Sequence, residues 1–220
     1  MKLLAVDTAL GACSCALMDD ARVLAHRFEV MERGHAERLA PMVQEVMADA
    51  GVEFAQVARL AVTTGPGTFT GQRVGLSFMR GMRVALKIPL TGVTTLEAMA
   101  RAAMAQTGQP FGAALHDAKR NEVYVELLNG DVTMISARIA TLEEAVAALS
   151  EAVGNAPLCL AGTAAQAASV LYPGATTVTD IRQPDALWVG RIARTKEVTA
   201  EAPAPLYLRP PDAKLPAPRP

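Results

Sequence analysis

The chain of 220 residues has few cysteines, no long apolar run and almost no net charge. Cys13 and Cys15 lie two apart in a predicted strand without metal-site spacing, so we expect small core residues in a reducing compartment. No stretch approaches the roughly 18 apolar residues of a membrane span. The apolar start is interrupted too soon by Asp7 to be a signal peptide. The net charge of −1 argues against a surface that binds nucleic acid throughout. We expect a cytoplasmic protein with no membrane partner.

Several catalytic motifs are absent. The glycine-rich turn at residues 65–71 is followed by Gln72 and Arg73, whereas a Walker A loop needs Lys-Ser/Thr directly after its last glycine. A GxGxxG dinucleotide fingerprint and a GxSxG nucleophile elbow are also missing. The three histidines form no i, i+4 pair that would place two imidazoles on one helix face for a metal. An anion at the N-terminus of the following helix remains an open alternative.

The rest of the chain is organised around residues 60–86, which read LAVTTGPGTFTGQRVGLSFMRGMRVAL. The short apolar run at 60–63 predicts a buried strand. Gly-Pro-Gly then forces a sharp turn, because glycine tolerates positive φ and proline fixes its own φ. The spacing predicts a helix over 71–86, with Thr68 or Thr70 as the N-cap.

This predicted helix is apolar around most of its circumference, which indicates burial on more than one side. Small residues recur along it at Gly71, Gly75 and Gly81. Glycine inside a helix costs about 1 kcal/mol relative to alanine, so we expect that another backbone approaches closely here. The cover could come from this chain or from a partner.

Basic residues form a ragged stripe along the same helix, at Arg73, Arg80, Arg83 and Lys87. One interpretation is a solvated face. The other is contact with an acidic partner or with tRNA phosphates.

The predicted elements follow the order β-β-β-α-β-α-β-α, which is the order of RNase H-like folds, including the actin, chaperone and sugar-kinase (ASKHA) group. The first set comprises strands at 3–7, 13–18 and 22–29, a helix at 35–50, a strand at 60–63, a helix at 71–86, a strand at 90–93 and a helix at 95–106. The second set comprises strands at 111–117, 122–128 and 132–138, a helix at 141–153, a strand at 158–161, a helix at 163–171, a strand at 176–178 and a helix at 184–195. We predict an α/β fold of two related lobes, 1–108 and a smaller 109–202.

The tail at 203–220 holds half of the 14 prolines. We expect it to be extended, docked through residues 206–208, and mobile after about Pro211.

In a duplicated fold of this kind, the turns after the first strand of each lobe face each other across a cleft. Asp7, Thr8 and Asp117 occupy those turns. A carboxylate at each turn could orient a metal-bound phosphate or a water, although aspartate also commonly caps turns. The chain lacks a Gly-Gly adenosine loop and has only Ala-Gly-Thr at 161–163. These residues are therefore candidates for a vestigial nucleotide cleft.

Four motifs lie in order along the chain: LAVDT at 4–8, TGPGTFTGQRVG at 64–75, DAKRNEVY at 117–124 and PLYLR at 205–209. Together they resemble the TsaB family of bacterial tRNA threonylcarbamoyladenosine (t6A) biosynthesis subunits. The resemblance covers nearly the whole chain, and the GPGTFTG run with the Arg-Val-Gly after it is highly specific.

The resemblance implies an ASKHA-type fold and a non-catalytic scaffold or activating subunit. It implies that a related partner, TsaD, holds the metal and transfers the threonylcarbamoyl group to N6 of adenosine 37 in tRNAs that read A-starting codons. The ATPase TsaE joins the pair. ATP, metal and threonylcarbamoyl-AMP would then belong to partner subunits, with no cofactor expected in this chain. Contact with tRNA would be indirect or minor, and the isolated chain could form a homodimer.

The resemblance also implies that TsaD binds helices of the first lobe. Methionines suit a face that adapts to a partner. The interface residues expected on this basis are Leu39, Met42, Val46, Met47, Gly71, Val74, Gly75, Phe78, Met79 and Met82. We expect Gly75→Leu or Met79→Asp to abolish TsaD binding while the fold survives.

Two other functions remain open. A stand-alone ASKHA-type ATPase or small-molecule kinase would need an adenosine loop and paired acidic residues, and only Asp7 and Asp117 qualify. A peptidase is disfavoured because the histidine pair of a metal site is absent, since His35 is followed four residues later by Leu39.

Overall fold

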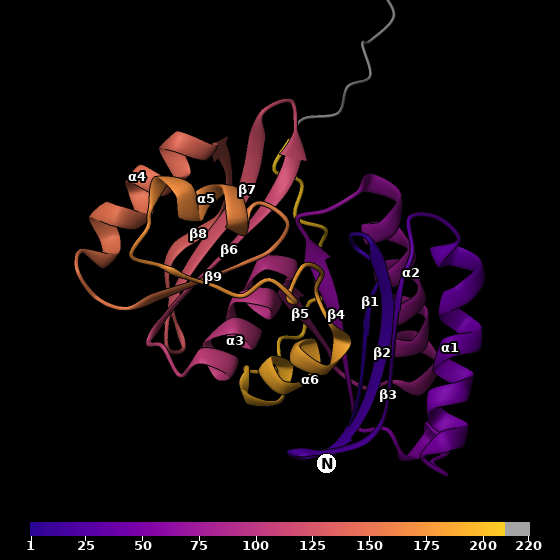
Figure 1. Cartoon of the computed structure of the whole chain (residues 1–220). Coiled ribbons are helices and arrows are strands. Elements are labelled where there is room, and N and C mark those ends of the chain that lie inside the picture. Colours follow the sequence, from indigo (N-terminus) through magenta and orange to yellow (C-terminus); the bar gives the residue numbers. More distant parts are fainter. Residues whose placement is uncertain (210–220) are drawn as a thin grey trace, which may run out of the picture.

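The computed structural model describes residues 1–209, which form two five-stranded sheets with helices on both faces (Figure 1). The order of elements follows the sequence prediction. The predicted mobility after Pro211 lies outside the described residues.

The first sheet has the strand order β3-β2-β1-β4-β5. Its strands are β1 (Lys2–Asp7), β2 (Ala12–Asp19), β3 (Arg22–Val30), β4 (Arg59–Gly65) and β5 (Leu90–Thr94). β1 pairs antiparallel with β2 and parallel with β4, so it is the central strand. It is buried on both faces, which explains its continuous apolar run.

The second sheet repeats this arrangement in the order β10-β9-β6-β7-β8. Its strands are β6 (Phe111–Lys119), β7 (Glu122–Asn129), β8 (Val132–Thr141), β9 (Leu158–Ala161) and β10 (Thr176–Thr177). β6 pairs antiparallel with β7 and parallel with β9, as β1 does with β2 and β4. Two lobes with one shared topology confirm the predicted ASKHA-type fold class.

Helices fill three layers around the two sheets (Figure 1). α1 (His35–Asp49) and α2 (Phe69–Leu86) cover one face of the first sheet. α3 (Thr95–Thr107) lies between the sheets and packs on β6, β7 and β9 as well as on β4 and β5. The second sheet is covered on its other face by α4 (Leu142–Val153) and α5 (Ala165–Leu171). In the first lobe, a 3₁₀ turn at Phe54–Gln56 precedes β4.

The last helix, α6 (Ala186–Thr195), requires a correction to the predicted lobe boundary. We expected it in the second lobe, within 109–202. It instead packs on β1, β2 and β4 of the first sheet, where Ala186 and Val189 belong to the same buried cluster as Leu3 and Ala5 of β1. A helix has one apolar stripe that specifies burial but not which sheet buries it.

The structure confirms the helix N-caps that the sequence predicted at Thr68 and Thr141. Thr68 caps α2, because its hydroxyl accepts a hydrogen bond from the Gly71 amide at 3.0 Å. Thr141 and Glu144 form the predicted capping box of α4. For α3 the cap is Thr94, one residue before the predicted start, and its hydroxyl accepts from the Glu97 amide.

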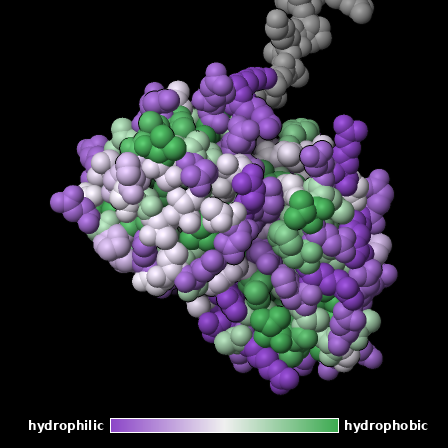
Figure 2. All heavy atoms as spheres, in the orientation of Figure 1, coloured by the Kyte–Doolittle hydropathy of each residue, from purple (hydrophilic) through white to green (hydrophobic). Residues whose placement is uncertain are grey.

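Most apolar side chains are inside this structure. Figure 2 shows hydrophobic surface as small separate patches between hydrophilic residues on the face in view. None of the helices that the structure describes is long and apolar enough to cross a membrane.

Candidate functional site

The junction between β1 and the start of α2 accounts for two of the recurring glycines. A Cβ atom at Gly71 would lie 2.2 Å from the Thr8 carbonyl oxygen, and one at Gly75 would lie 2.8 Å from the Thr8 hydroxyl. The same hydroxyl donates a hydrogen bond to the Gly71 carbonyl at 2.7 Å. The close approach that the sequence predicted is therefore made by β1 of this chain. The assignment of Gly71 and Gly75 to a partner interface is corrected accordingly.

The turn before α2 also closes over the end of β1. A Cβ atom at Gly67 would lie 2.3 Å from the Ala9 carbonyl oxygen, and the Thr68 amide donates to that oxygen at 2.8 Å. Thr8 is only 1% exposed and Asp7 is fully buried. The turn after the first strand is thus filled by backbone of the same lobe.

Asp7 is a buried carboxyl group that holds its proton more tightly than an exposed one. Its Oδ1 accepts from the Thr63 hydroxyl at 2.5 Å and from the Ala9 amide at 3.2 Å, while Oδ2 has no hydrogen-bond partner among the described residues. Burial raises the pKa of Asp7 to about 7, because the charged form loses its hydration. A buried carboxyl group of this kind does not face Asp117 across an open cleft, so the predicted pairing of the two carboxylates is wrong.

Asp117 does line a cleft between the lobes, with a volume of about 630 Å³. Its Oδ2 accepts from Lys119 Nζ at 3.0 Å and its Oδ1 from the Lys119 amide at 2.8 Å, and these bonds lower the pKa of Asp117. His116 also lines the cleft, is 8% exposed and has no partner for Nδ1 among the described residues. Burial lowers the pKa of His116 to about 4, so its imidazole is neutral at pH 7.

A metal site is not assembled by these groups. The described residues contain no cluster of three or more His, Cys, Asp or Glu side chains that could hold a metal ion. Asp7 and Thr8 lie under the turn before α2, and Asp117 is engaged by Lys119. These contacts do not favour binding of a metal-bound nucleotide phosphate at these three residues.

The methionine-rich positions of α1 and α2 require a second correction. They form the core between the helices and the first sheet, as α1 and α2 lay their apolar stripes on β1, β2 and β4. The fully covered members of the predicted interface, at 0–4% exposure, are Leu39, Met42, Val46, Met47 and Met79. Their side chains are unavailable to a partner because the fold already covers them.

The expectation that Gly75→Leu or Met79→Asp would leave the fold intact fails for the same reason. A side chain at Gly75 meets Thr8 and Val62, and Met79 is 0% exposed. Either substitution would therefore damage the core itself.

Three members of the predicted interface keep partial exposure, namely Val74, Phe78 and Met82. Gly81 and Ala85 on the same side of α2 are exposed, and a Cβ atom at Gly81 would meet no atom within 4 Å. On the neighbouring α1 the exposed positions are mostly small or uncharged: Ala36, Ala40, Pro41, Gln44 and Ala48. We call these exposed positions of α1 and α2 the outer helix face.

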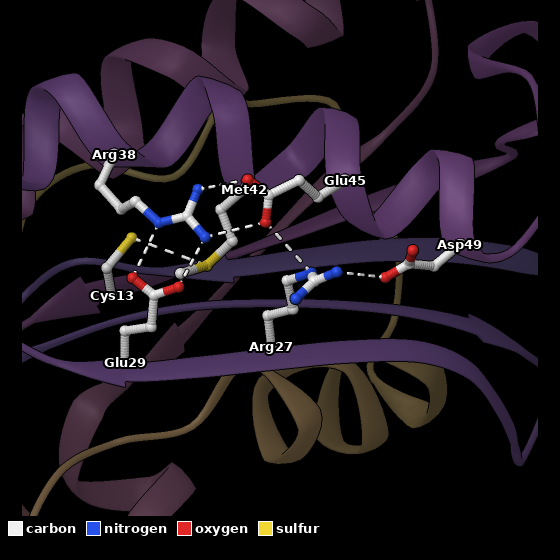
Figure 3. A network of polar contacts seen from close by, with 7 residues as sticks. All are labelled: Cys13, Arg27, Glu29, Arg38, Met42, Glu45 and Asp49. Carbon is white, nitrogen blue, oxygen red and sulfur yellow. Dashed lines mark hydrogen bonds and ion pairs between the residues drawn. The ribbon is translucent and has the colours of Figure 1, made fainter.

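Figure 3 shows the ion pairs that fix α1 on β3. Arg38 Nη2 contacts Glu29 Oε1 on β3 at 2.5 Å, and Arg38 Nη1 contacts Glu45 Oε1 at 2.8 Å. Arg27 on β3 pairs with Glu45 at 3.2 Å and with Asp49 at 2.7 Å. The charged side of α1 is thus engaged by β3, and the uncharged outer side is left free.

The basic stripe contacts the C-terminal segment, which the sequence alone did not indicate. Arg80 Nη2 donates to the Pro203 carbonyl and Arg83 Nη2 to the Ala200 carbonyl, both at 2.6 Å. Arg73 Nε donates to the Tyr207 hydroxyl at 2.9 Å. We call residues 199–209 the strap.

The strap also joins the two lobes. The Leu206 amide donates to the Thr64 carbonyl at 2.8 Å, which confirms that residues 206–208 dock on the first lobe. Arg209 then donates to the Ala118 carbonyl at 3.1 Å and pairs with Glu122 of the second lobe.

Comparison with known proteins identifies the family. A family model described as "TsaD: tRNA N6-adenosine threonylcarbamoyltransferase" matches residues 25–182. A Haemophilus influenzae protein named as the tRNA threonylcarbamoyladenosine biosynthesis protein TsaB is 32% identical over 95% of this chain and 94% of that protein. The chain belongs to the TsaB family. The Escherichia coli TsaB protein is 41% identical over 56% of this chain. That match spans 53% of the length of the relative.

Solved structures agree with this family assignment. A Pseudomonas aeruginosa protein described as similar to peptidase YeaZ superposes with a TM-score of 0.79 at 31% identity, covering 94% of this chain and 99% of that one. A second structure, YeaZ from the same organism, gives 0.77 at 29% identity with the same coverage. Component A of the Acidaminococcus fermentans (R)-2-hydroxyglutaryl-CoA dehydratase gives 0.54 at 13% identity over 88% of this chain and 98% of that one, which shows the fold alone.

Proposed function

We propose that the chain is a non-catalytic subunit of the t6A machinery that binds and activates a TsaD-type partner in the cytoplasm. The TsaB family name places it in t6A biosynthesis, and the family model that it matches is described by the partner's own activity. In this proposal the partner transfers the threonylcarbamoyl group to N6 of adenosine 37 in tRNAs that read A-starting codons. TsaE joins through the partner, and ATP, metal and threonylcarbamoyl-AMP bind to those subunits.

The outer helix face is the observation that carries the proposal. Its uncharged small residues border the partly exposed Val74, Phe78 and Met82. Gly81 lies in a helix interior where an added Cβ atom would meet no other segment within 4 Å, although glycine destabilises such a position by about 1 kcal/mol. A partner helix that approaches closely at Gly81 gives this glycine a role, whereas the free chain does not.

The sharpest test places a large side chain at Gly81. Gly81→Arg has room in the free chain, so it should fold normally and weaken binding of the TsaD-type partner from the same organism by about 100-fold, the effect of losing a central contact. Val132→Arg is the matched control, because Val132 is 61% exposed at the start of β8, in the other lobe. Isothermal titration with purified partner measures both. Equal affinity of the two variants and wild type would exclude the outer helix face as the interface.

Activity provides the second readout. We expect the partner with TsaE, ATP and tRNA to form little t6A until this chain is added. Addition of the Gly81→Arg variant should increase t6A formation much less than addition of wild type. The chain without partner should neither modify tRNA nor bind magnesium-ATP with micromolar affinity. Modification by the chain alone, or such ATP binding, would instead favour the stand-alone ATPase or kinase.

Without a partner, the same face offers a surface for self-association. We expect the free chain to form a homodimer that Gly81→Arg converts to monomer and Val132→Arg does not. Sedimentation velocity measures this, and a dimer unaffected by Gly81→Arg would place self-association elsewhere.

A further inference from the structure

A second exposed surface of α2 lies on a different side of the helix from the outer helix face. Phe69, Arg73, Arg80 and Arg83 are spaced i, i+4, i+11 and i+14, which aligns them along one side of an α-helix. α2 contains no aspartate or glutamate. The three arginines form no ion pair with any carboxylate that the structure describes. Three positive charges are therefore aligned with no anionic partner among residues 1–209.

The strap positions these arginines without neutralising them. Each guanidinium donates a hydrogen bond to a neutral acceptor: Arg73 to the hydroxyl of Tyr207, Arg80 to the carbonyl of Pro203 and Arg83 to the carbonyl of Ala200. A guanidinium has five N–H donors, so further donors and the whole charge remain. Arginines held in place lose less side-chain entropy when they bind an anion.

An exposed aromatic pair lies at the N-terminal end of the stripe. Phe69 and Tyr207 stack with ring centroids 5.7 Å apart, and the Arg73 guanidinium carbon lies 3.5 Å from the Phe69 centroid. Phe69 is 55% exposed and Tyr207 44%. Aromatic rings beside arginines are typical of surfaces that bind unpaired bases and the adjoining phosphates. An acidic peptide would use the arginines but would leave the exposed rings without a role.

We propose that Arg73, Arg80 and Arg83 bind the phosphates of single-stranded RNA while an unpaired base stacks on the Phe69–Tyr207 pair. This rests on the proposed function, in which the complex acts on tRNA. The RNA surface and the outer helix face are separate sides of α2, so RNA and the partner subunit bind at the same time.

Fluorescence anisotropy of the full-length chain, alone and with its TsaD-type partner, tests the proposal with a labelled tRNA transcript and an unstructured oligoribonucleotide. About three phosphate contacts to a single strand predict a log–log salt slope near −2. Arg73→Gln, Arg80→Gln and Arg83→Gln together should weaken binding at least about tenfold and bring the slope close to zero. Phe69→Ala should weaken binding to the single strand by about tenfold and binding to duplex RNA little.

Two controls separate binding from folding. The three arginines changed to lysine keep the charge but lose the planar donor set, so this variant should bind RNA far better than the glutamine variant even if the strap loosens. Arg22→Gln removes the same charge from an exposed site at the start of β3 and should have no effect.

Unchanged affinity and slope in the glutamine variant would overturn the proposal, as would tighter binding of polyglutamate than of RNA. Partner binding is measured on the same samples. Intact partner binding without RNA binding refutes only this inference, whereas RNA binding without partner binding refutes the proposed function and leaves this inference standing.

Discussion

The two lobes share one strand order, yet the carboxyl groups near the ends of their first strands have opposite properties. Asp7 near the end of β1 is fully buried, and burial raises its pKa to about 7. Asp117 near the end of β6 lines the cleft, and its bonds with Lys119 lower its pKa. The same topology therefore places one carboxyl group in the core and the other in solvent.

The register of the two first strands explains this difference. Asp7 comes one residue after the last β1–β4 pair, Val6 with Val62, whereas Asp117 comes three residues after the last β6–β9 pair, Ala114 with Ala161. In both lobes a glycine after the fourth strand closes over the chain near the end of the first strand: Gly67 is close to the Ala9 carbonyl and Gly162 to the Leu115 carbonyl. The position of each carboxyl group along its strand, rather than the strand order, therefore decides whether it is covered.

The largest effect should come from filling the close contacts that both lobes share. Gly67→Val and Gly162→Val place a Cβ atom 2.3 Å and 2.2 Å from a backbone carbonyl oxygen, so each should lower the free energy of unfolding by about 4 kcal/mol or prevent folding. Gly81→Ala is the control and should stabilise the chain by up to about 1 kcal/mol. Denaturant titration measures all three. A tolerated Gly162→Val would break the parallel between the lobes.

Truncation of a side chain should cost more unfolding free energy on α2 than on α5. Met79→Ala removes a side chain that is 0% exposed on α2 and should cost about 3 kcal/mol of unfolding free energy. Val170 on α5 is 73% exposed, and Val170→Ala should change stability by less than about 0.5 kcal/mol. Similar losses in both variants would contradict the contrast between a core helix and a short outer helix.

The two aspartates should differ in how stability depends on pH. Because the pKa of Asp7 is raised in the folded state, Asp7 contributes fully to the free energy of unfolding below its unfolded pKa of about 4. This contribution is lost as pH rises to about 7. This loss should be on the order of 2 kcal/mol between pH 5 and 7, and Asp7→Asn should remove it. Glu126, whose pKa burial also raises to about 7, keeps part of the pH dependence in that variant.

Asp117 should behave in the opposite sense. Its lowered pKa gives a contribution that is present above its unfolded pKa and is lost as pH falls through its folded pKa. Asp117→Asn should therefore alter stability only in acid, with little change between pH 5 and 7. Thermal unfolding of the two aspartate variants from strongly acidic pH up to pH 7 measures both effects, and equal profiles would show that Asp7 is not buried as described.

The smallest effect should come from the ion-pair network between β3 and α1. Arg38→Gln removes contacts with Glu29 and Glu45, whose side chains are about 40% exposed. The melting temperature should fall slightly in low salt, and the difference should shrink in 1 M salt because exposed pairs are screened. A loss that persists in high salt would indicate that packing of the arginine stem is the main contribution.

Sequence patterns predicted the elements well, and they did so where the signal is local. The Thr68 cap, the capping box of Thr141 and Glu144, and both three-strand meanders are read from neighbouring residues. The placement of α6 was missed because an apolar stripe fits either sheet. The methionines of α1 and α2 were misassigned because hydrophobic periodicity reports burial without naming the cover.

The sequence by itself determined the family motifs and the order of strands and helices, because these depend on residues close together in the chain. Only the tertiary structure decided which surfaces remain free. The Asp7–Thr63 and Arg73–Tyr207 contacts join residues 56 and 134 positions apart, and Met79 is buried because α2 packs on the first sheet. Such contacts depend on how the layers stack, and a side chain's exposure is a property of that packing rather than of its own identity.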